Sequence, residues 1–280
     1  MPARARRTRT LNPLVELFDA GGPAENLLPE ELVHLYGGSL SLPSSCLYAN
    51  FVSSIDGVVA LEGGRAPSGG IISRRSEADR FVMGLLRAFA DAIVVGAGTV
   101  RAEGGRALWT PEFIFPSAAA GFHEVRRSLK RSRTPLLVIV TSSGNLDPAQ
   151  DALQAGALVL TTRAAEGALR ARLPSASRVV AISDNSRLEP AGVIAAVRAE
   201  GYRVVLTEGG PTLFGQFVEA GLVDELFLTL SPALAGHAPG RSFGLIEGVY
   251  FGRELRPARL HSIRRSGDYL FLRYGLKGAA

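Results

Sequence analysis

The sequence has a single cysteine, Cys46, among its 280 residues, and this scarcity limits where the protein can work. One cysteine permits no internal disulfide bond, which is typical of proteins that fold in a reducing compartment. The sequence also lacks an apolar run long enough to cross a bilayer, since a spanning helix needs about 20 apolar residues in a row. We therefore expect a cytoplasmic protein without a membrane segment.

Motifs for several common kinds of catalysis are missing as well. The four histidines are scattered, and there is no CxxC pair, HExxH helix or deaminase-type zinc motif, so the sequence predicts no metal site. The absence of a GxxxxGK[ST] loop argues against a P-loop NTPase, and the absence of a GxSxG elbow argues against an α/β-hydrolase. We therefore expect chemistry that needs neither a metal cluster nor an activated serine.

Positive charge is concentrated at one end of the chain. The formal net charge is +5, and the first ten residues, MPARARRTRT, hold four arginines and no acid. No basic helix or aromatic-basic module follows this stretch, so we expect no nucleic-acid partner. We interpret residues 1–25 as a basic flexible tail and residues 26–280 as one domain.

Strand and helix patterns alternate along most of the chain. Continuous apolar runs such as AIVV (92–95) predict strands buried on both faces, and amphipathic stretches such as residues 73–90 predict helices between them. The alternation predicts an α/β fold with a mostly parallel central sheet flanked by helices on both faces. Two C-terminal runs, residues 258–267 and 268–276, have no helix between them and predict antiparallel edge strands.

Four other segments give more local predictions. Residues 44–61 predict a strand that bends at Asp56-Gly57, and residues 62–70 predict a glycine-rich loop. We expect residues 104–134 to be a loop containing one short basic helix. The apolar run at 223–232 predicts a strand with an exposed edge that could pair with a second copy of the chain.

Two glycine-rich turns follow predicted strands. The first holds Gly96 and Gly98, and the second holds Gly209, Gly210 and Pro211. In open parallel sheets, ligands bind at the carboxyl ends of the strands, where glycines let backbone N–H groups approach a phosphate and a helix N-terminus favours negative charge. Either turn alone is better explained by tight strand-to-helix packing, and neither is a GxGxxG motif. Two such turns on one sheet favour a two-part phosphate ligand.

Three charged residues stand out, and each has an alternative structural role. Asp56 fits a simple Asp-Gly turn, Glu208 can cap the helix that follows it, and Arg87 can be a solvated helix charge. Their chemistry also suits a site for a polar substrate, because a forked guanidinium binds anions well. The residues alone leave both alternatives open.

Three motifs occur in order: ANFVSSIDGVVAL, LLRAFADAIVVGAGTVRAE and VVLTEGGPTLFGQFVEAGLVDELFLTLSPALAG. Together they resemble the reductase domain of riboflavin-biosynthesis enzymes over about residues 47–275, in the form that stands free of the deaminase domain. The resemblance implies a dihydrofolate-reductase-like fold and an NADPH-dependent oxidoreductase that forms a homodimer. The implied reaction reduces the ribosyl group of 5-amino-6-(5-phosphoribosylamino)uracil to a ribityl group, by hydride transfer to C1 of the sugar.

The same resemblance implies roles for particular residues. Glu208 and Asp56 would be catalytic, with Glu208 facing the substrate. Substrate contacts would come from Asn50, Arg87 and Glu208, with the Arg87 guanidinium suited to a phosphate. Cofactor contacts would come from Val52, Gly96, Gly98, Thr99, Glu103, Ser142, Gly209, Gly210, Pro211, Thr212 and Leu213.

The sequence departs from the family at one loop, where the common D-P-x-L-x-x-R continuation is replaced by GGRALWT (104–110). The family's arginine has no counterpart in register, although Arg106 lies nearby. The departure leaves open a same-fold reductase of another substrate such as dihydrofolate, or a non-catalytic NADPH-binding protein. The basic run at 126–133 can either meet the 2′-phosphate that distinguishes NADPH from NADH or form a solvated surface.

Overall fold

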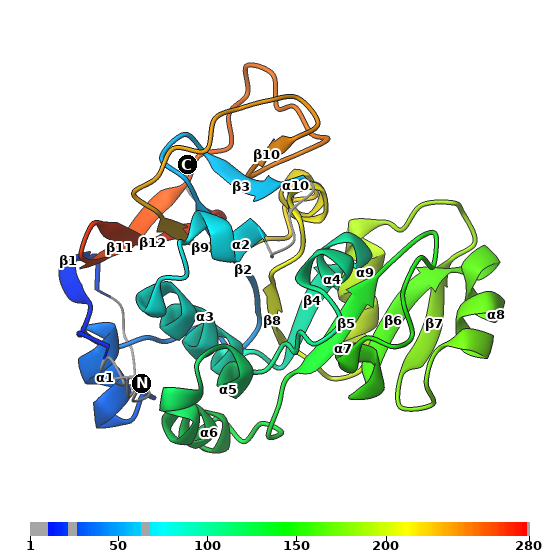
Figure 1. The fold of residues 1–280 in the computed structure, drawn as a ribbon, viewed down its shortest axis with the longest axis horizontal. Coiled ribbons are helices and arrows are strands. Elements are labelled where there is room, and N and C mark those ends of the chain that lie inside the picture. The colour runs from blue at the N-terminus through cyan, green and yellow to red at the C-terminus, as the bar shows by residue number, and fades with distance from the viewer. Residues whose placement is uncertain (1–10, 22–26, 63–67, 279–280) are drawn as a thin grey trace, which may run out of the picture.

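The computed structural model describes residues 11–21, 27–62 and 68–278, and within them ten strands form one sheet (Figure 1). At its β9 side the sheet continues with antiparallel strands β12 (Tyr269–Gly275), β11 (Arg259–Ser266) and β1 (Val15–Asp19). The other strands run parallel, in the order β9 (Glu225–Leu230), β2 (Cys46–Ser53), β8 (Val204–Thr207), β4 (Ala92–Gly96), β5 (Leu136–Val140), β6 (Ala157–Thr162) and β7 (Arg178–Ser183). The predicted mostly parallel sheet with antiparallel C-terminal strands at one side is confirmed, and the short β1 lies outside those strands.

The central strands are buried on both faces because their side chains alternate between two helical layers. In β4, Ile93 and Val95 belong to one apolar cluster, and Ala92 and Val94 belong to the other. The second layer contains α9 (Pro190–Ala199) and α10 (Pro211–Glu219). The first layer contains α1 (Glu30–Tyr36), α3 (Glu77–Phe89), α4 (Ala97–Glu103), α6 (Ala119–Ser128), α7 (Asp151–Gln154) and α8 (Arg163–Arg172). Helices therefore cover both faces, as predicted.

Helix α3 packs on the first face of the sheet and carries part of the candidate site. Ser76 caps its N-terminus by accepting the backbone N–H of Asp79 at 3.3 Å, so the helix begins at Glu77 rather than at residue 73. At its other end the buried Arg126 donates to three main-chain oxygens between residues 87 and 90. These bonds satisfy carbonyl groups that a helix C-terminus leaves unpaired.

The predicted bend at Asp56-Gly57 separates two strands that lie in different sheets. Strand β3 (Val58–Leu61) pairs with β10 (Ser242–Gly244) in a small antiparallel sheet beside α10 (Figure 1). Helix α2 (Ser68–Ile72) begins within the expected glycine-rich loop, whose residues 63–67 lie outside the described part of the chain. The Ser68 hydroxyl bonds both the N–H and the carbonyl of Leu61, which ties α2 to β3.

Strand β1 lies inside the segment expected as a flexible tail, residues 1–25. It pairs with β11, and the buried Arg264 of β11 binds Glu16 and Asp19 at 3.3 and 2.9 Å. Residues 15–19 thus form a strand within the segment expected as a tail. Its apolar side chains Val15, Leu17 and Phe18 are exposed, and the strand is held by its pairing with β11, which a local sequence pattern does not reveal. Residues 1–10 and 22–26 lie outside the described ranges. A single domain over residues 26–280 stays a prediction.

Two further expectations are corrected by the structure. Residues 104–134 hold α5 (Pro111–Ile114) and η1 (Pro116–Ala118) as well as α6, because each proline begins a new helical turn. Strand β9 lies between β2 and β12, so it has no exposed edge for a second copy. In the described part of the chain, the edges of the large sheet are β1 and β7.

Candidate active site

Two adjoining cavities open at the carboxyl ends of the parallel strands. The larger has a volume of about 980 Å³, and the smaller has a volume of about 440 Å³. Strands β4 and β8 end here, in the two glycine turns. The residues that line both cavities mark their junction: Ala60, Ser68, Thr99, Ala102, Gly210 and Pro211.

The two glycine turns are in contact with each other. A Cβ atom on Gly209 would lie 2.8 Å from the Leu213 side chain and 3.5 Å from the backbone nitrogen of Gly96. Gly96 and Gly210 are the N-caps of α4 and α10, and no side chain caps either helix, so their first N–H groups are available to a ligand. Pro211, at the first position of α10, removes an N–H that the helix would not use.

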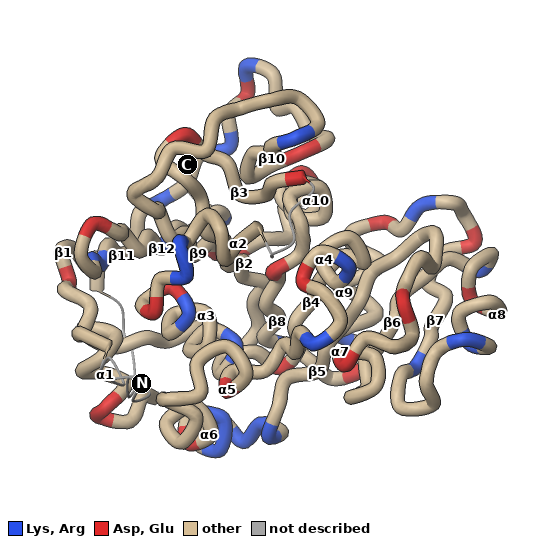
Figure 2. Tube along the Cα trace, viewed as in Figure 1, with Lys and Arg blue, Asp and Glu red and all other residues tan. Residues whose placement is uncertain are grey.

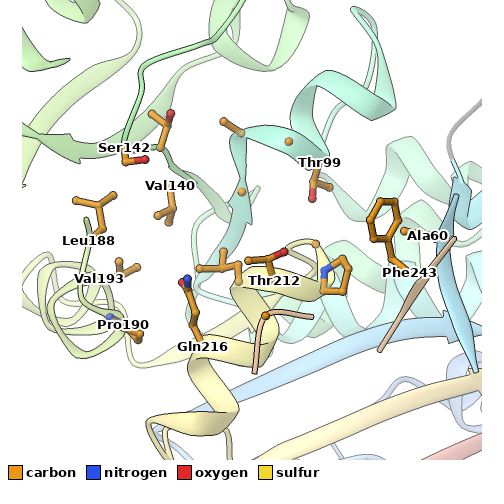
Figure 3. Close-up of a pocket in the computed structure, with 18 of the residues that line it drawn as sticks. Ala60, Thr99, Val140, Ser142, Leu188, Pro190, Val193, Thr212, Gln216 and Phe243 are labelled. Carbon is orange, nitrogen blue, oxygen red and sulfur yellow. The ribbon is translucent and has the colours of Figure 1, made fainter. Parts of the chain in front are cut away.

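The larger cavity extends from β3 and β10 to the start of α9. Figure 3 shows Thr99 and Thr212 between its two ends, one formed by Ala60 and Phe243 and the other by Leu188. A long cavity with uncapped helix N-termini at its middle suits a dinucleotide, whose pyrophosphate is central. Most residues predicted to bind a cofactor line it: Gly96, Gly98, Thr99, Ser142, Gly210, Pro211, Thr212 and Leu213.

The smaller cavity lies between α2, α3 and the loop at 104–110. The loop contributes Ala107, Leu108 and the buried Trp109, which form an apolar wall. The remaining predicted site residues, except Asp56, line this cavity: Asn50, Val52, Arg87, Glu103, Glu208 and Gly209. Three of these, Val52, Glu103 and Gly209, were expected on the cofactor side, but they line only the smaller cavity.

Arg87 and Glu208 form a buried ion pair in the smaller cavity. Arg87 Nη2 lies 2.7 Å from Glu208 Oε2, and Arg87 Nε donates to both carboxylate oxygens. Arg87 Nη1 donates to the carbonyls of Leu108 and Thr110 at 3.2 and 3.4 Å. Only one of the five guanidinium N–H groups remains for a ligand. The arrangement therefore argues against the predicted phosphate contact, and Arg87 instead orients Glu208 and holds the 104–110 loop.

Two further carboxyl groups line the smaller cavity. Asp79 of α3 is buried, and this burial raises the pKa of its carboxyl to about 6, although the hydroxyls of Thr229 and Ser73 oppose the rise. Burial also raises the pKa of Glu103, and the charge of Arg87 opposes that rise. Carboxyl groups with raised pKa values in a cleft are candidates for proton transfer or for binding polar ligands.

One side of α3 faces the smaller cavity and contains residues that were not predicted for the site. Asp79, Met83 and Arg87 follow at four-residue spacing, and Arg80 precedes Arg87 by seven residues, so all four line the smaller cavity. Arg75 lines it from the turn before α3, with a left-handed φ of 56°. Neither Arg75 nor Arg80 has an ion-pair partner among the described residues. The signal that could have found them is the recurrence of charge along one side of an otherwise apolar helix.

Asp56 lies outside the lining of both cavities. Its carboxylate accepts the hydroxyl of Ser54 and the backbone N–H groups of Ala235 and Gly236, at 3.1 and 2.7 Å. The Ser54 hydroxyl, followed by these N–H groups, lowers the pKa of Asp56 to about 2. Asp56 thus joins the β2–β3 turn to the loop after β9, and this geometry favours a structural role over the predicted catalytic one, which stays a prediction.

The basic run at 126–133 also lies away from the larger cavity. Figure 2 shows it beyond the end of α6, far from α10. Arg131 Nε binds Asp91 at 2.8 Å, just before β4 begins, whereas the cavities lie where β4 ends. The run therefore does not meet a cofactor phosphate, and its Arg126 caps α3 instead.

Within the described ranges, no cluster of three or more His, Cys, Asp or Glu side chains could hold a metal ion. No helix there has the length and apolar character needed to span a bilayer. Among the described residues, the site thus combines backbone N–H groups at the glycine turns with a smaller cavity that holds the buried Arg87–Glu208 pair, the guanidinium groups of Arg75 and Arg80, the buried Asp79 and the half-buried Glu103.

Fold and site together define an α/β reductase of the dihydrofolate-reductase-like class. Residues 46–266 match the family described as the RibD C-terminal domain. The match covers most of the chain, so the protein belongs to this family of riboflavin-biosynthesis reductases and is an oxidoreductase.

Individual relatives agree with this assignment. The chain is 28% identical over 225 residues to the 2,5-diamino-6-ribosylamino-4(3H)-pyrimidinone 5′-phosphate reductase of Archaeoglobus fulgidus, covering 79% of this chain and 94% of that one. A pyrimidine reductase-like protein from Corynebacterium diphtheriae superposes with a TM-score of 0.65 at 25% identity, over 84% of this chain and 95% of that one. A bifunctional deaminase and 5-amino-6-(5-phosphoribosylamino)uracil reductase from Thermotoga maritima superposes with a TM-score of 0.60 at 19% identity. The superposition covers 83% of this chain and 56% of that one, and it shows the shared fold.

Proposed function

We propose that the protein is an NADPH-dependent reductase of a ribosylaminopyrimidine 5′-phosphate, and that it converts the ribosyl group to a ribityl group. The observation that carries the proposal is the junction of the two cavities at Thr99, Gly210 and Pro211. A dinucleotide in the larger cavity would there meet a substrate in the smaller one. Hydride transfer requires such contact between two ligands and no protein nucleophile.

The larger cavity fits a nicotinamide dinucleotide at three points. The uncapped start of α10 and the turn at Gly96 would hold the pyrophosphate. Gly96 faces open space, since a Cβ atom there would have no other atom within 4 Å. Arg187 lines the end near Leu188, where a guanidinium would bind the 2′-phosphate of NADPH. When bound, the cofactor supplies the hydride.

The reaction balances with one hydride and one proton. The bond between C1 of the ribose and its ring oxygen breaks, the oxygen takes a proton, and C1 takes the hydride, so the sugar becomes an open ribityl chain. Glu103 is suited to hold that proton, because burial raises its pKa. Glu208, fixed by Arg87, would orient the sugar by accepting hydrogen bonds from its hydroxyls.

The substrate phosphate needs a cation other than Arg87. Arg75 and Arg80 line the smaller cavity and have no ion-pair partner among the described residues. They would supply the positive charge of the family's arginine, which has no counterpart in register in the 104–110 loop. A same-fold reductase of a pterin such as dihydrofolate is the second candidate, and the apolar wall of Leu108 and Trp109 favours it because a flat ring would pack there.

We also propose that the protein works in the cytoplasm as a homodimer. The single cysteine, Cys46, is buried and free, which fits a reducing compartment.

The large apolar side chains of Leu234, Tyr250 and Leu255 are among the most exposed of the described residues, at 76, 91 and 81%. They belong to the long segment between β9 and β11, and exposed apolar groups favour association with a second copy. Analytical ultracentrifugation of Tyr250→Ser against wild type tests this, and a monomeric wild type would contradict it.

Steady-state NADPH oxidation tests the proposed function. The wild-type enzyme is offered a ribosylaminopyrimidine 5′-phosphate and dihydrofolate in parallel, and the product is identified by mass spectrometry. The proposal predicts turnover of the first substrate to a ribityl product, at least about 100-fold faster in kcat/KM than dihydrofolate. Turnover of dihydrofolate alone, or of neither substrate despite NADPH binding, would contradict it.

A further inference from the structure

Asp79 is a buried carboxyl group that the proposed reaction leaves without a role. It is 6% exposed, it lines the smaller cavity and not the larger one, and it has no ion-pair partner among the described residues. Its close partners are the hydroxyls of Ser73 and Thr229, which occupy part of a carboxylate's four acceptor positions. The nearby charges of Arg80 and Glu208 act on it with opposite sign.

Burial of an acid on the apolar side of a helix is costly unless something compensates for it. Phe81 and Val82, which follow on α3, are buried apolar residues, so packing alone would favour an apolar residue at position 79. A carboxylate that faces a cavity with spare acceptor positions is suited to a ligand with two parallel N–H donors.

Two relatives are named for substrates that differ at position 2 of the pyrimidine ring. The Archaeoglobus fulgidus reductase is named for a 2,5-diamino-4(3H)-pyrimidinone, and the Thermotoga maritima reductase is named for a uracil. The first ring presents N3–H and the 2-amino group side by side, which match the two oxygens of a carboxylate. The uracil presents N3–H between two carbonyl oxygens, and these would repel a carboxylate.

The position of Asp79 in the smaller cavity agrees with a contact to the N3–H and 2-amino edge of the ring. The ribose is attached at C6, and its C1 must lie at the junction of the cavities near Thr99 and Gly210. The N3 and 2-amino edge is on the opposite side of the ring from C6. Asp79 lines the smaller cavity and is not among the residues that line both cavities at their junction.

We propose that Asp79 binds the N3–H and 2-amino edge of the base, so that this enzyme acts on the 2-amino-4-oxopyrimidine and not on the uracil. The inference rests on the proposed function and selects its substrate class. The enzyme would then act before the 2-amino group is removed by hydrolysis. That hydrolytic step must use the ribityl product as its substrate.

Base binding tests the inference without turnover. Isothermal calorimetry of the NADPH-loaded enzyme compares 2,5,6-triamino-4-pyrimidinone with 5,6-diaminouracil, which differ at C2. We expect the triamino base to bind roughly 10- to 100-fold more tightly, as one charge-assisted hydrogen bond gained and one repulsion avoided imply. Asp79→Asn, which keeps the shape of the side chain, should remove this preference. Glu77→Gln, on the exposed side of the same helical turn, is the matched control and should retain it.

A pH series on the wild type supplies a second readout that needs no variant. The preference for the triamino base should weaken as the pH falls below about 6, where Asp79 gains a proton, and it should be independent of pH in Asp79→Asn. A purely structural role would leave the ratio of the two affinities constant across pH.

Three results would overturn the inference: equal affinity of the wild type for both bases, equal losses for both in Asp79→Asn, or a preference that does not change with pH. Turnover of the two ribosylaminopyrimidine 5′-phosphates is measured beside binding. A wild type that keeps the base preference but reduces neither phosphate would contradict the proposed function while supporting the role of Asp79.

Discussion

Arg87 on α3 and Glu208 at the end of β8 bind each other through a two-point ion pair, with Nη2 2.7 Å from Oε2, although 121 residues separate them in the chain. The pair brings the acidic residue that precedes the second glycine turn to the smaller cavity. It also connects α3 to the 104–110 loop, because Nη1 donates to Leu108 and Thr110. The Arg87 guanidinium therefore connects helix α3, Glu208 in the smaller cavity and the 104–110 loop.

The first prediction concerns this pair. Glu208→Gln should leave the affinity for NADPH nearly unchanged and lower kcat at least tenfold, because the sugar loses a charged acceptor. Arg87→Met should cost about 3 kcal/mol of unfolding free energy, since it leaves a buried carboxylate without its partner. The double variant Arg87→Met/Glu208→Met should regain much of that stability without regaining activity. Urea unfolding and steady-state kinetics measure these effects, and a collapse of NADPH binding in Glu208→Gln would refute the assignment to the substrate.

The second prediction concerns the glycine turn at the larger cavity. Gly96→Val would place its side chain in open space that we assign to the pyrophosphate, so KM for NADPH should rise at least about tenfold. The fold should tolerate the change, because φ is −78° and only the cap preference is lost, at about 1 kcal/mol. Gly167→Val on α8, where a Cβ atom also meets nothing within 4 Å, is the matched control. Equal KM values for both variants would show that the turn does not hold the cofactor.

The third prediction assigns Asp56 to stability rather than to catalysis. Its pKa is lowered to about 2, below the ordinary value of 3.8, so its contribution to stability is present above about pH 4 and is lost as the pH falls towards 2. Asp56→Asn should therefore be less stable at neutral pH, and its melting temperature should depend less on pH in that window. Its kcat at 25 °C should equal that of the wild type. A large loss of kcat in a folded Asp56→Asn would restore the catalytic role.

The fourth prediction concerns the phosphate. Arg75→Gln/Arg80→Gln should raise KM for the phosphorylated substrate by roughly 10- to 100-fold, because two charge-assisted contacts are lost. The dephosphorylated substrate should be affected far less. Arg74→Gln is the control, because Arg74 is an exposed neighbour with the same left-handed backbone that does not line the cavity. Equal losses for both substrates in the double variant would place the phosphate elsewhere.

The sequence revealed those parts of the protein that depend on local pattern. Buried strands such as β4 show as apolar runs, and the turns at Gly96 and Gly210 show as glycines after a strand, so the sheet and the larger cavity were predictable. The course of the chain after Asp56 was not predictable, because β3 leaves the main sheet only through its pairing with β10. Strand β1 was hidden for the same reason.

The chemistry of the smaller cavity was harder to predict, because it depends on contacts between distant segments. The motif that contains Arg87 gave no sign that Glu208 and the 104–110 loop use nearly all its donors. Asp79 lies in the first turn of α3, where acidic residues are common, and its burial beside Thr229 depends on how the helix packs on the sheet. Neither burial nor pairing across 121 residues can be read from a local pattern.

Deuterium transfer tests the central claim, reduction at the junction of the two cavities, most directly. The wild-type enzyme is supplied with NADPH deuterated at either face of nicotinamide C4, together with the ribosylaminopyrimidine 5′-phosphate, and the product is examined by mass spectrometry and NMR. The account predicts one deuterium at C1 of the ribityl chain from one of the two cofactors and none from the other. Consumption of NADPH with no deuterium at C1 from either cofactor would contradict it.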